Sequence, residues 1–210
     1  MPPALARPTL SQLYARHAAR WHHSITHLGY PEAYALLAET DMAARQRPPR
    51  YVLDAGCGSG AFAEQVVARG STPTHLTLLD PSQEMLEQAR KREWRETPDT
   101  VSGRLEDISA LPRLYDTVLC AHVLEHTADL ETSMNQLAQA LTPGGSLLLA
   151  VSKPHWCTAL LRWRWGHKAY RPEDICAALA RAGLTGINAI RFVKGPPSRT
   201  SCGYRAVKPV

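Results

Sequence analysis

The sequence lacks any run of apolar residues long enough to span a membrane. Its first nine residues are proline-rich and lack the apolar stretch of a secretory signal. The five cysteines are an odd number and form no C-x-x-C pair, which argues against a disulfide framework and a structural zinc site. We therefore expect a cytoplasmic, reduced protein without a metal centre.

Positive charge exceeds negative charge only slightly in this sequence. The formal net charge is +5 and the sequence pI is about 9.1, but the basic residues are scattered and no RNA-binding module motif occurs. Ordinary solubility charge explains this excess better than a nucleic-acid partner does. The basic stretch 90–95 is expected to form the solvated end of a helix.

The segment 52–60 is the most informative part of the chain. A short apolar run ends in Asp54, and Gly56, Gly58 and Gly60 then alternate with small residues before a helical pattern. Glycines at a strand-to-helix turn allow a tight bend, and they allow a ligand to approach the N–H groups that begin the helix. The pattern predicts a nucleotide-type site.

Two nucleotide folds use such a turn. The glycine spacing with Ala61 fits the looser dinucleotide fingerprint, and Asp80 ends the next apolar run at a suitable distance. Asp54 directly before the turn would repel a pyrophosphate, yet it can pair with an ammonium group. S-adenosylmethionine, which carries an amino acid and a ribose but no phosphate, suits both acids. A nicotinamide-dependent dehydrogenase stays open as an alternative.

Strands and helices are predicted to alternate after two N-terminal helical patterns at 9–28 and 32–45. Strands are expected at 51–55, 75–79, 100–103, 117–121, 146–151, 187–193 and 204–207, and helices at 61–69, 82–93, 130–141 and 171–182. This alternation predicts a doubly wound α/β fold whose ligand lies at the carboxyl ends of the parallel strands. We expect a helical lid at 1–49 and one core at 50–210.

Five segments in this order resemble the motifs of class I S-adenosylmethionine-dependent methyltransferases. They are 52–60, 79–86, 103–108, 115–126 and 141–151, and the resemblance covers roughly residues 50–210. It implies a Rossmann-like seven-stranded sheet, mostly parallel, that ends in an antiparallel hairpin with the last strand beside the fifth. Leu124-Glu125-His126 is most similar to the small-molecule, quinone-biosynthesis-like branch (methyltransferase type 11).

The resemblance also implies a cofactor site for S-adenosylmethionine. Its expected residues are Tyr14, Asp54, Ala55, Gly56, Gly58, Gly60, Asp80, Pro81, Met85, Glu106, Asp107, Ile108, Ala121 and His122. Asp54 and the glycine turn would hold the methionine end, Asp80 the ribose hydroxyls and Asp107 the adenine amino group. Met85 and Ile108 would sandwich the adenine ring, although Ile108 is equally expected to be a packing residue.

The acceptor side is less defined. His122 and His126 are candidate bases because histidine titrates near neutrality. In a helical turn Glu125 would point away from both, so a metal site built from these three is the weaker alternative. Trp21, His126, His155, Trp156 and Trp163 are expected to bind the substrate, with core packing or a dimer contact as the alternative for the tryptophans.

The resemblance therefore predicts an enzyme that methylates a small-molecule acceptor. No Asn/Asp-Pro-Pro-Tyr/Phe tetrapeptide and no Pro-Cys follow the fourth strand, which disfavours methylation of base amino groups, glutamine or cytosine C5. RNA or protein methylation and a non-catalytic cofactor-binding domain remain alternatives. The acceptor atom and the oligomeric state, monomer or homodimer, stay open.

Overall fold

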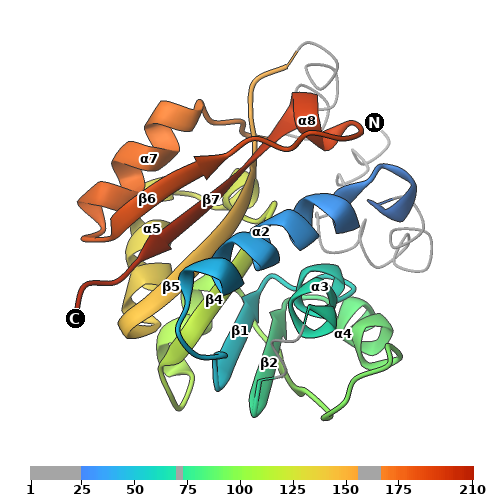
Figure 1. Ribbon diagram of the computed structural model, residues 1–210. Coiled ribbons are helices and arrows are strands. Elements are labelled where there is room, and N and C mark those ends of the chain that lie inside the picture. Colours follow the sequence, from blue (N-terminus) through green and yellow to red (C-terminus); the bar gives the residue numbers. More distant parts are fainter. Residues whose placement is uncertain (1–24, 70–72, 156–166) are drawn as a thin grey trace, which may run out of the picture.

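The computed structural model describes residues 25–69, 73–155 and 167–210 (Figure 1). Its elements in chain order are α2 (Tyr30–Ala44), β1 (Tyr51–Ala55), α3 (Ala61–Ala68), β2 (His75–Asp80), α4 (Gln83–Arg90), β3 (Asp99–Ser102), η1 (Leu105–Ala110), β4 (Tyr115–Ala121), η2 (Leu124–His126), α5 (Leu130–Gln139), β5 (Leu141–Ser152), α7 (Pro172–Arg181), β6 (Thr185–Ile190), α8 (Pro197–Thr200) and β7 (Ser201–Val207).

The strands form one seven-stranded sheet in the order β3-β2-β1-β4-β5-β7-β6. The first five strands are parallel to one another, and β7 lies antiparallel between β5 and β6. The predicted doubly wound fold, with its last strand beside the fifth, is confirmed. The chain moves outward from β1 and then returns to β4, so the switch point lies between these two strands.

Helices cover both faces of the sheet (Figure 1). Leu78 and Leu148 pack into the layer formed by α2, α3 and α4. Their neighbours Leu79 and Leu149 pack into the opposite layer with α5, α7 and η1. Successive strand residues alternate between the two layers, and both layers are apolar. This explains the near-continuous apolar runs of the central strands.

Helix α2 is the described part of the segment predicted as a lid. It begins after Gly29, whose φ of 80° lies in the left-handed region, and its Leu37 is completely buried in the core. This helix is therefore a core layer. The covering role of the preceding segment stays a prediction, because residues 1–24 lie outside the described ranges.

The basic stretch after α4 differs from its prediction. The helix ends at Arg90, and the side chain of Arg92 is only 9% exposed. Its guanidinium pairs with Glu64 at 2.5 Å and donates a hydrogen bond to the carbonyl of Ser59 in the glycine turn. The prediction of a solvated end is thus wrong for Arg92, because contacts distant in sequence turn its side chain inward, whereas Arg90, Lys91 and Arg95 are exposed.

The predicted Gly-Gly turn lies within β5. Tyr115 pairs with Leu141, whereas Thr117 pairs with Ser146, so the residues between them bulge out of the strand. Gly144 within the bulge has a φ of 75°. The strand therefore begins five residues earlier than its apolar run suggests.

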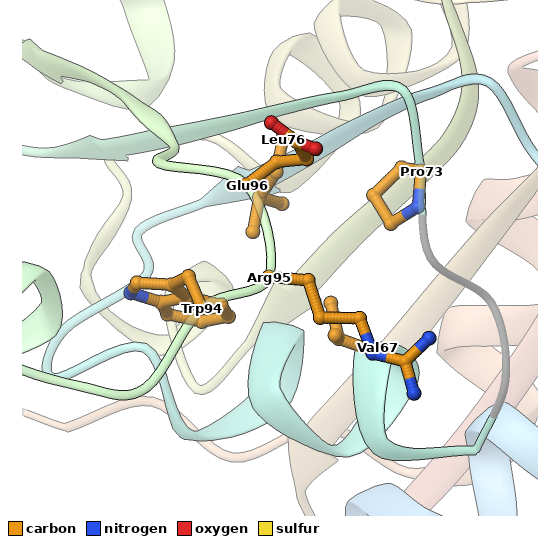
Figure 2. A pocket seen from close by; sticks show the side chains of 6 residues that line it. All are labelled: Val67, Pro73, Leu76, Trp94, Arg95 and Glu96. Carbon is orange, nitrogen blue, oxygen red and sulfur yellow. The ribbon is translucent and has the colours of Figure 1, made fainter.

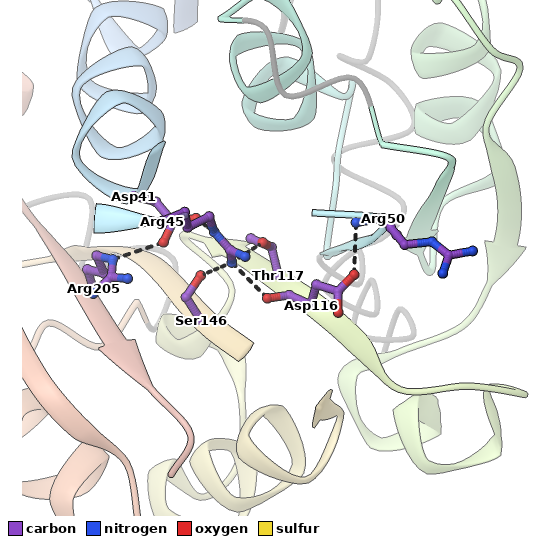
Figure 3. A network of polar contacts seen from close by, with 7 residues as sticks. All are labelled: Asp41, Arg45, Arg50, Asp116, Thr117, Ser146 and Arg205. Atoms are coloured by element: carbon purple, nitrogen blue, oxygen red, sulfur yellow. Dashed lines mark hydrogen bonds and ion pairs between the residues drawn. The ribbon is translucent and has the colours of Figure 1, made fainter. Parts of the chain in front are cut away.

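The amino-terminal edge of the sheet carries a buried polar network (Figure 3). Asp41 on α2 accepts from Arg45 at 2.5 Å and from Arg205 on β7 at 2.9 Å. Arg45 also donates to the hydroxyls of Thr117 on β4 and Ser146 on β5. We call these five residues the amino-edge network; it joins the end of α2 to three strands.

Two other features bear on function. A small pocket near the start of β2 is lined by Val67, Pro73, Leu76, Trp94, Arg95 and Glu96 (Figure 2). Within residues 25–69, 73–155 and 167–210, no helix is both long enough and apolar enough to cross a bilayer.

Candidate active site

Each of the three glycines in the turn between β1 and α3 is required at its position for a different physical reason. All have positive φ. A Cβ on Gly56 would lie 2.3 Å from the Val123 side chain, and one on Gly60 would lie 3.2 Å from the Cβ of Ala89. A Cβ on Gly58 would meet no atom within 4 Å. Gly58 is therefore the point where the backbone faces open space that a ligand can enter.

Asp80 ends β2 beside this turn, as predicted. Its carboxylate accepts from the N–H of Gly58 at 2.8 Å and from the N–H of Ser82 at 2.9 Å. Each carboxylate oxygen can accept two hydrogen bonds, so capacity remains for two hydroxyls of a ligand. Burial raises the pKa of Asp80. The Ser82 hydroxyl caps α4 by accepting from the N–H of Met85, which is itself buried.

Asp54 lies near the end of β1 and is 1% exposed. Its carboxylate accepts from the N–H of Ala63 at 3.2 Å. Burial raises the pKa of Asp54 to about 7; Asp80 adds to this rise, and the Ala63 N–H and Arg92 oppose it. Two buried carboxylates beside the turn make this place suitable for a cationic group and unsuitable for a pyrophosphate.

The predicted adenine side lies around η1. Glu106 and Asp107 are exposed, and Asp107 accepts from the N–H of Arg104 at 2.7 Å, which leaves acceptor capacity on its carboxylate. Ile108 is buried in the core cluster that contains α5. Ile108 is thus a packing residue in this structure, and its contact with an adenine ring stays a prediction.

His122 follows Ala121 at the end of β4 and has a φ of 58°, a left-handed backbone that is unusual outside glycine. Its Nδ1 lies 3.1 Å from Oε1 of Glu125 and 3.3 Å from Oγ of Ser152. The prediction that Glu125 points away is wrong. The two residues are three apart, a spacing that brings side chains together on a helical turn, and His122 precedes the 3₁₀ turn 124–126 with its left-handed backbone.

Three buried side-chain atoms have no hydrogen-bond partner within the described part of the chain. They are Nε2 of His122, Oε2 of Glu125 and Oγ of Ser201. All three belong to one place, because Ser201 pairs with Ser152 across β5 and β7, and Ser152 contacts both other residues. Unpaired buried polar groups are costly, so their concentration at one place indicates a functional site.

The second predicted base has a different environment. The ring of His126 lies edge-on to that of His167, with the centroids 4.1 Å apart. Burial, with the charge of His167 adding to it, lowers the pKa of His126 to about 4. A base of this strength takes up protons poorly at neutral pH. His122 is therefore the stronger candidate.

Aromatic side chains from α2 also lie at this edge. Tyr30 is edge-on to His122 with the centroids 5.0 Å apart, and Tyr34 stacks on Phe62 at 4.8 Å. Sequence analysis singled out neither tyrosine, nor Ser152, Ser201 or His167. The predicted residues Tyr14, Trp21, Trp156 and Trp163 lie outside the described ranges. Pro81 is exposed directly after Asp80 and His155 is partly buried, and their roles stay predictions.

Comparison with known proteins identifies the family. A family described as a methyltransferase domain matches residues 26–189, more than half of the chain. The chain belongs to this methyltransferase family. The resemblance to class I S-adenosylmethionine-dependent methyltransferases is thereby confirmed, and the dehydrogenase alternative falls.

Individual relatives agree with this assignment. The chain is 33% identical to a ubiquinone biosynthesis O-methyltransferase of Nitrosomonas europaea, over 73% of this chain and 74% of that protein. It spans only 32% and 30% of two uncharacterized relatives from Streptomyces fradiae and Synechococcus.

Solved structures show the same fold. The N-methyltransferase NodS of Bradyrhizobium japonicum, solved with S-adenosyl-L-homocysteine, has a TM-score of 0.67 at 20% identity, covering 85% of this chain and 87% of that one. An O-methyltransferase family protein from Burkholderia thailandensis has a TM-score of 0.73 at 17% identity, covering 92% and 60%. At this identity the likeness concerns the fold.

The residues present fit S-adenosylmethionine. The open space at Gly58 admits a ligand, and Asp80 beside it retains acceptor capacity for hydroxyls. Asp54 offers a negative charge for an ammonium group. No group of three or more His, Cys, Asp or Glu side chains among the described residues is arranged to hold a metal ion.

Proposed function

We propose that this chain transfers a methyl group from S-adenosylmethionine to a small-molecule acceptor at the carboxyl ends of β1, β2 and β4. The observation that carries the proposal is the pair of buried acids, Asp54 and Asp80, around the open backbone of Gly58. When bound, the cofactor supplies an activated methyl group on a sulfonium.

The cofactor roles follow from chemistry. Asp54 would pair with the ammonium group, while Gly58 allows the methionine end to lie against the turn. Asp80 would accept from the ribose hydroxyls through the oxygen capacity that its two backbone N–H donors leave free. Asp107 would accept from the adenine amino group, while Met85, like Ile108, is buried in the core, so its contact with the ring stays a prediction.

A hydroxyl is the acceptor group that the site suits best. A hydroxyl holds its proton at neutral pH and therefore needs a base, which amines that are already neutral do not. His122 offers a ring nitrogen, Nε2, that has no hydrogen-bond partner among the residues the structure describes. The similarity to a ubiquinone biosynthesis O-methyltransferase supports the same class of acceptor. Alignment of acceptor and methyl group can supply up to roughly 7–11 kcal/mol of the barrier.

The acceptor would be flat and largely apolar apart from its hydroxyl. Tyr30 lies edge-on to His122, and His126 and His167 form a second edge-on pair near the end of the same turn; such rings would contact a flat acceptor well. Trp21, Trp156 and Trp163, which the sequence predicts as substrate-binding residues, would add further aromatic surface to this pocket. We therefore propose phenols and catechols as the first acceptors to test.

The test is transfer of labelled methyl groups from S-adenosylmethionine to a panel of catechols, phenols, amines and unmodified tRNA. We expect label in the hydroxyl acceptors. His122→Asn, which tolerates the left-handed backbone, should lower turnover at saturating S-adenosylmethionine about 10²- to 10⁴-fold. Label only in tRNA, or full activity of His122→Asn, would contradict the proposal.

A further inference from the structure

Glu125 is a buried carboxyl group with several donors around one of its oxygens. The residue is 1% exposed. Its Oε1 accepts from the backbone N–H of Ser152 at 2.7 Å and lies 3.1 Å from Nδ1 of His122. Such a group requires compensation, because an ionised carboxylate without partners is costly to bury.

The partners determine which protons are present. Although burial acts to raise the pKa of Glu125, hydrogen bonds from His122 and Ser152 and the charge of His122 hold it well below its usual range. An ionised carboxylate can only accept hydrogen bonds. Nδ1 of His122 must therefore carry a hydrogen and donate it, and in the neutral ring Nε2 is left with its lone pair free.

The surroundings of His122 support a fixed ring. The left-handed backbone at this residue carries a conformational cost, which persists only where neighbouring contacts hold it. Its N–H donates to the carbonyl of Ala150 at 2.8 Å, and Tyr30 lies edge-on to the ring. Nε2 itself has no partner in the described part of the chain.

We propose that Glu125 is a positioning residue that holds His122 as the Nδ1–H tautomer and so leaves Nε2 to accept the proton of a hydroxyl acceptor. The inference rests on the proposed function for its chemical consequence. The acceptor oxygen forms a bond to the methyl carbon, the carbon–sulfur bond breaks with its electron pair going to sulfur, and the acceptor's proton passes to Nε2.

Other titratable groups face the same carboxylate. These are His126 on η2, His167 and Tyr170 from the segment before α7, Tyr34 on α2 and Cys120 on β4. Burial keeps each of them in its neutral form near pH 7 or above. His122 is the one that contacts the carboxylate through a ring nitrogen.

The first experiment needs no acceptor. Long-range proton–nitrogen NMR on protein labelled with ¹⁵N-histidine distinguishes the two neutral tautomers, and His122 is assigned by its absence from His122→Asn. In the wild type at pH 8 we expect Nδ1 to be protonated and Nε2 bare. An Nε2–H tautomer, or an even mixture, would overturn the proposal, whether or not any acceptor is methylated.

The second experiment is kinetic and uses Glu125→Gln, which keeps the shape and an oxygen for the Ser152 N–H but removes the negative charge that holds the hydrogen on Nδ1. We expect kcat to fall about 100-fold with a weakly acidic phenol. With a phenol that is already ionised at the assay pH, the loss should be less than about threefold, because no base is needed. KM and affinity for S-adenosylhomocysteine should change by less than about threefold.

Glu131→Gln is the matched control, because Glu131 is an exposed acid that pairs with Arg181 on another helix and does not contact His122. It should behave as the wild type with both phenols. Equal losses for the two phenols in Glu125→Gln would show a merely structural role and would overturn the proposal. If the wild type methylates nothing, the proposed function fails, while the tautomer measurement still decides the role of Glu125.

Discussion

The amino edge of the sheet, where the parallel strands begin, and the carboxyl edge, where they end, differ in how their buried polar groups are paired. Helix α2 connects the two edges. At the amino edge, Asp41 near the end of α2 lies between two guanidinium groups, and the hydroxyls beside it are also paired. At the carboxyl edge, where α2 begins, His122, Glu125 and Ser201 each have a buried atom with no hydrogen-bond partner among the described residues.

Asp41 and Asp54 show what this difference means. Both are almost fully buried. Asp41 forms ion pairs with two guanidinium groups, whereas Asp54 accepts from a backbone N–H and forms none. Burial and the nearby Asp80 raise the pKa of Asp54 to about 7, although Arg92 acts in the opposite direction. A carboxylate that is fully paired inside the protein stabilises the fold, and one without an ion pair is available to a ligand.

The largest effect should come from breaking the amino-edge network. Asp41→Ala leaves Arg45 and Arg205 without their counterion, and we expect a loss of about 3–5 kcal/mol in the free energy of unfolding. In a chain of this size that corresponds to a fall in Tm of roughly 10 °C. Urea denaturation followed by circular dichroism measures it.

Cofactor binding is the control for this variant. The affinity of folded Asp41→Ala for S-adenosylhomocysteine, measured well below its Tm, should equal that of the wild type. A Tm within about 2 °C of the wild type would mean that the network contributes little to stability.

The next effect concerns cofactor affinity. Asp80→Ala should weaken binding by about 2–3 kcal/mol, because charge-assisted hydrogen bonds to the ribose are lost. It also removes the acceptor for the Gly58 and Ser82 N–H groups, so some loss of stability is expected as well. Asp80→Asn keeps one acceptor oxygen and should lose less. Calorimetry and thermal melts on both variants separate the two contributions, and wild-type affinity in Asp80→Ala would remove Asp80 from the site.

The raised pKa of Asp54 predicts that cofactor binding depends on pH. Its raised pKa of about 7 means that the carboxyl group of the free protein is mostly neutral at pH 6. An ammonium group pairs with the ionised form, so binding should release a proton and tighten about tenfold from pH 6 to pH 7.5. Asp54→Asn should bind weakly and lose this slope, and an unchanged slope in the variant would assign it to another group.

The smallest expected effect distinguishes the role of Gly58 in ligand binding from the role of Gly56 in packing. Gly58→Ala places a Cβ in open space and costs only the left-handed backbone, about 1–2 kcal/mol of stability. Its cofactor affinity should fall more clearly than its stability, because the methyl group occupies the ligand's space. Gly56→Ala is the comparison, since its clash with Val123 should mainly destabilise the protein. Denaturation and calorimetry on the pair test this, and normal affinity in Gly58→Ala would contradict the placement of the ligand.

The sequence predicts the fold well where the signal is local. The apolar runs before Asp54 and Asp80 are strands because both of their faces are buried, and the alternation with helices leads directly to the sheet order. The start of β5 is less visible, since its first residues pair with β4 through a bulge. Arg92 is misjudged because its partner Glu64 lies on another helix.

The sequence predicts those site residues that lie at the ends of strands. It does not predict those whose role depends on contacts between distant segments. His122 stands out because it follows a strand. The role of Glu125 depends on the left-handed backbone of His122 before the turn 124–126, and on Ser152, which comes from β5. The contact of Tyr30 with His122 could not be predicted from the sequence either, because an aromatic residue on an apolar helix face is typical of core packing.

The central claim is that the carboxyl edge holds S-adenosylmethionine while the amino edge holds the fold together. Titration of S-adenosylhomocysteine by calorimetry into the wild type, Asp80→Asn and Asp41→Asn tests it most directly. We expect binding by the wild type, weakened binding by Asp80→Asn, and unchanged affinity of folded Asp41→Asn. No binding by the wild type, or a loss confined to Asp41→Asn, would contradict the account.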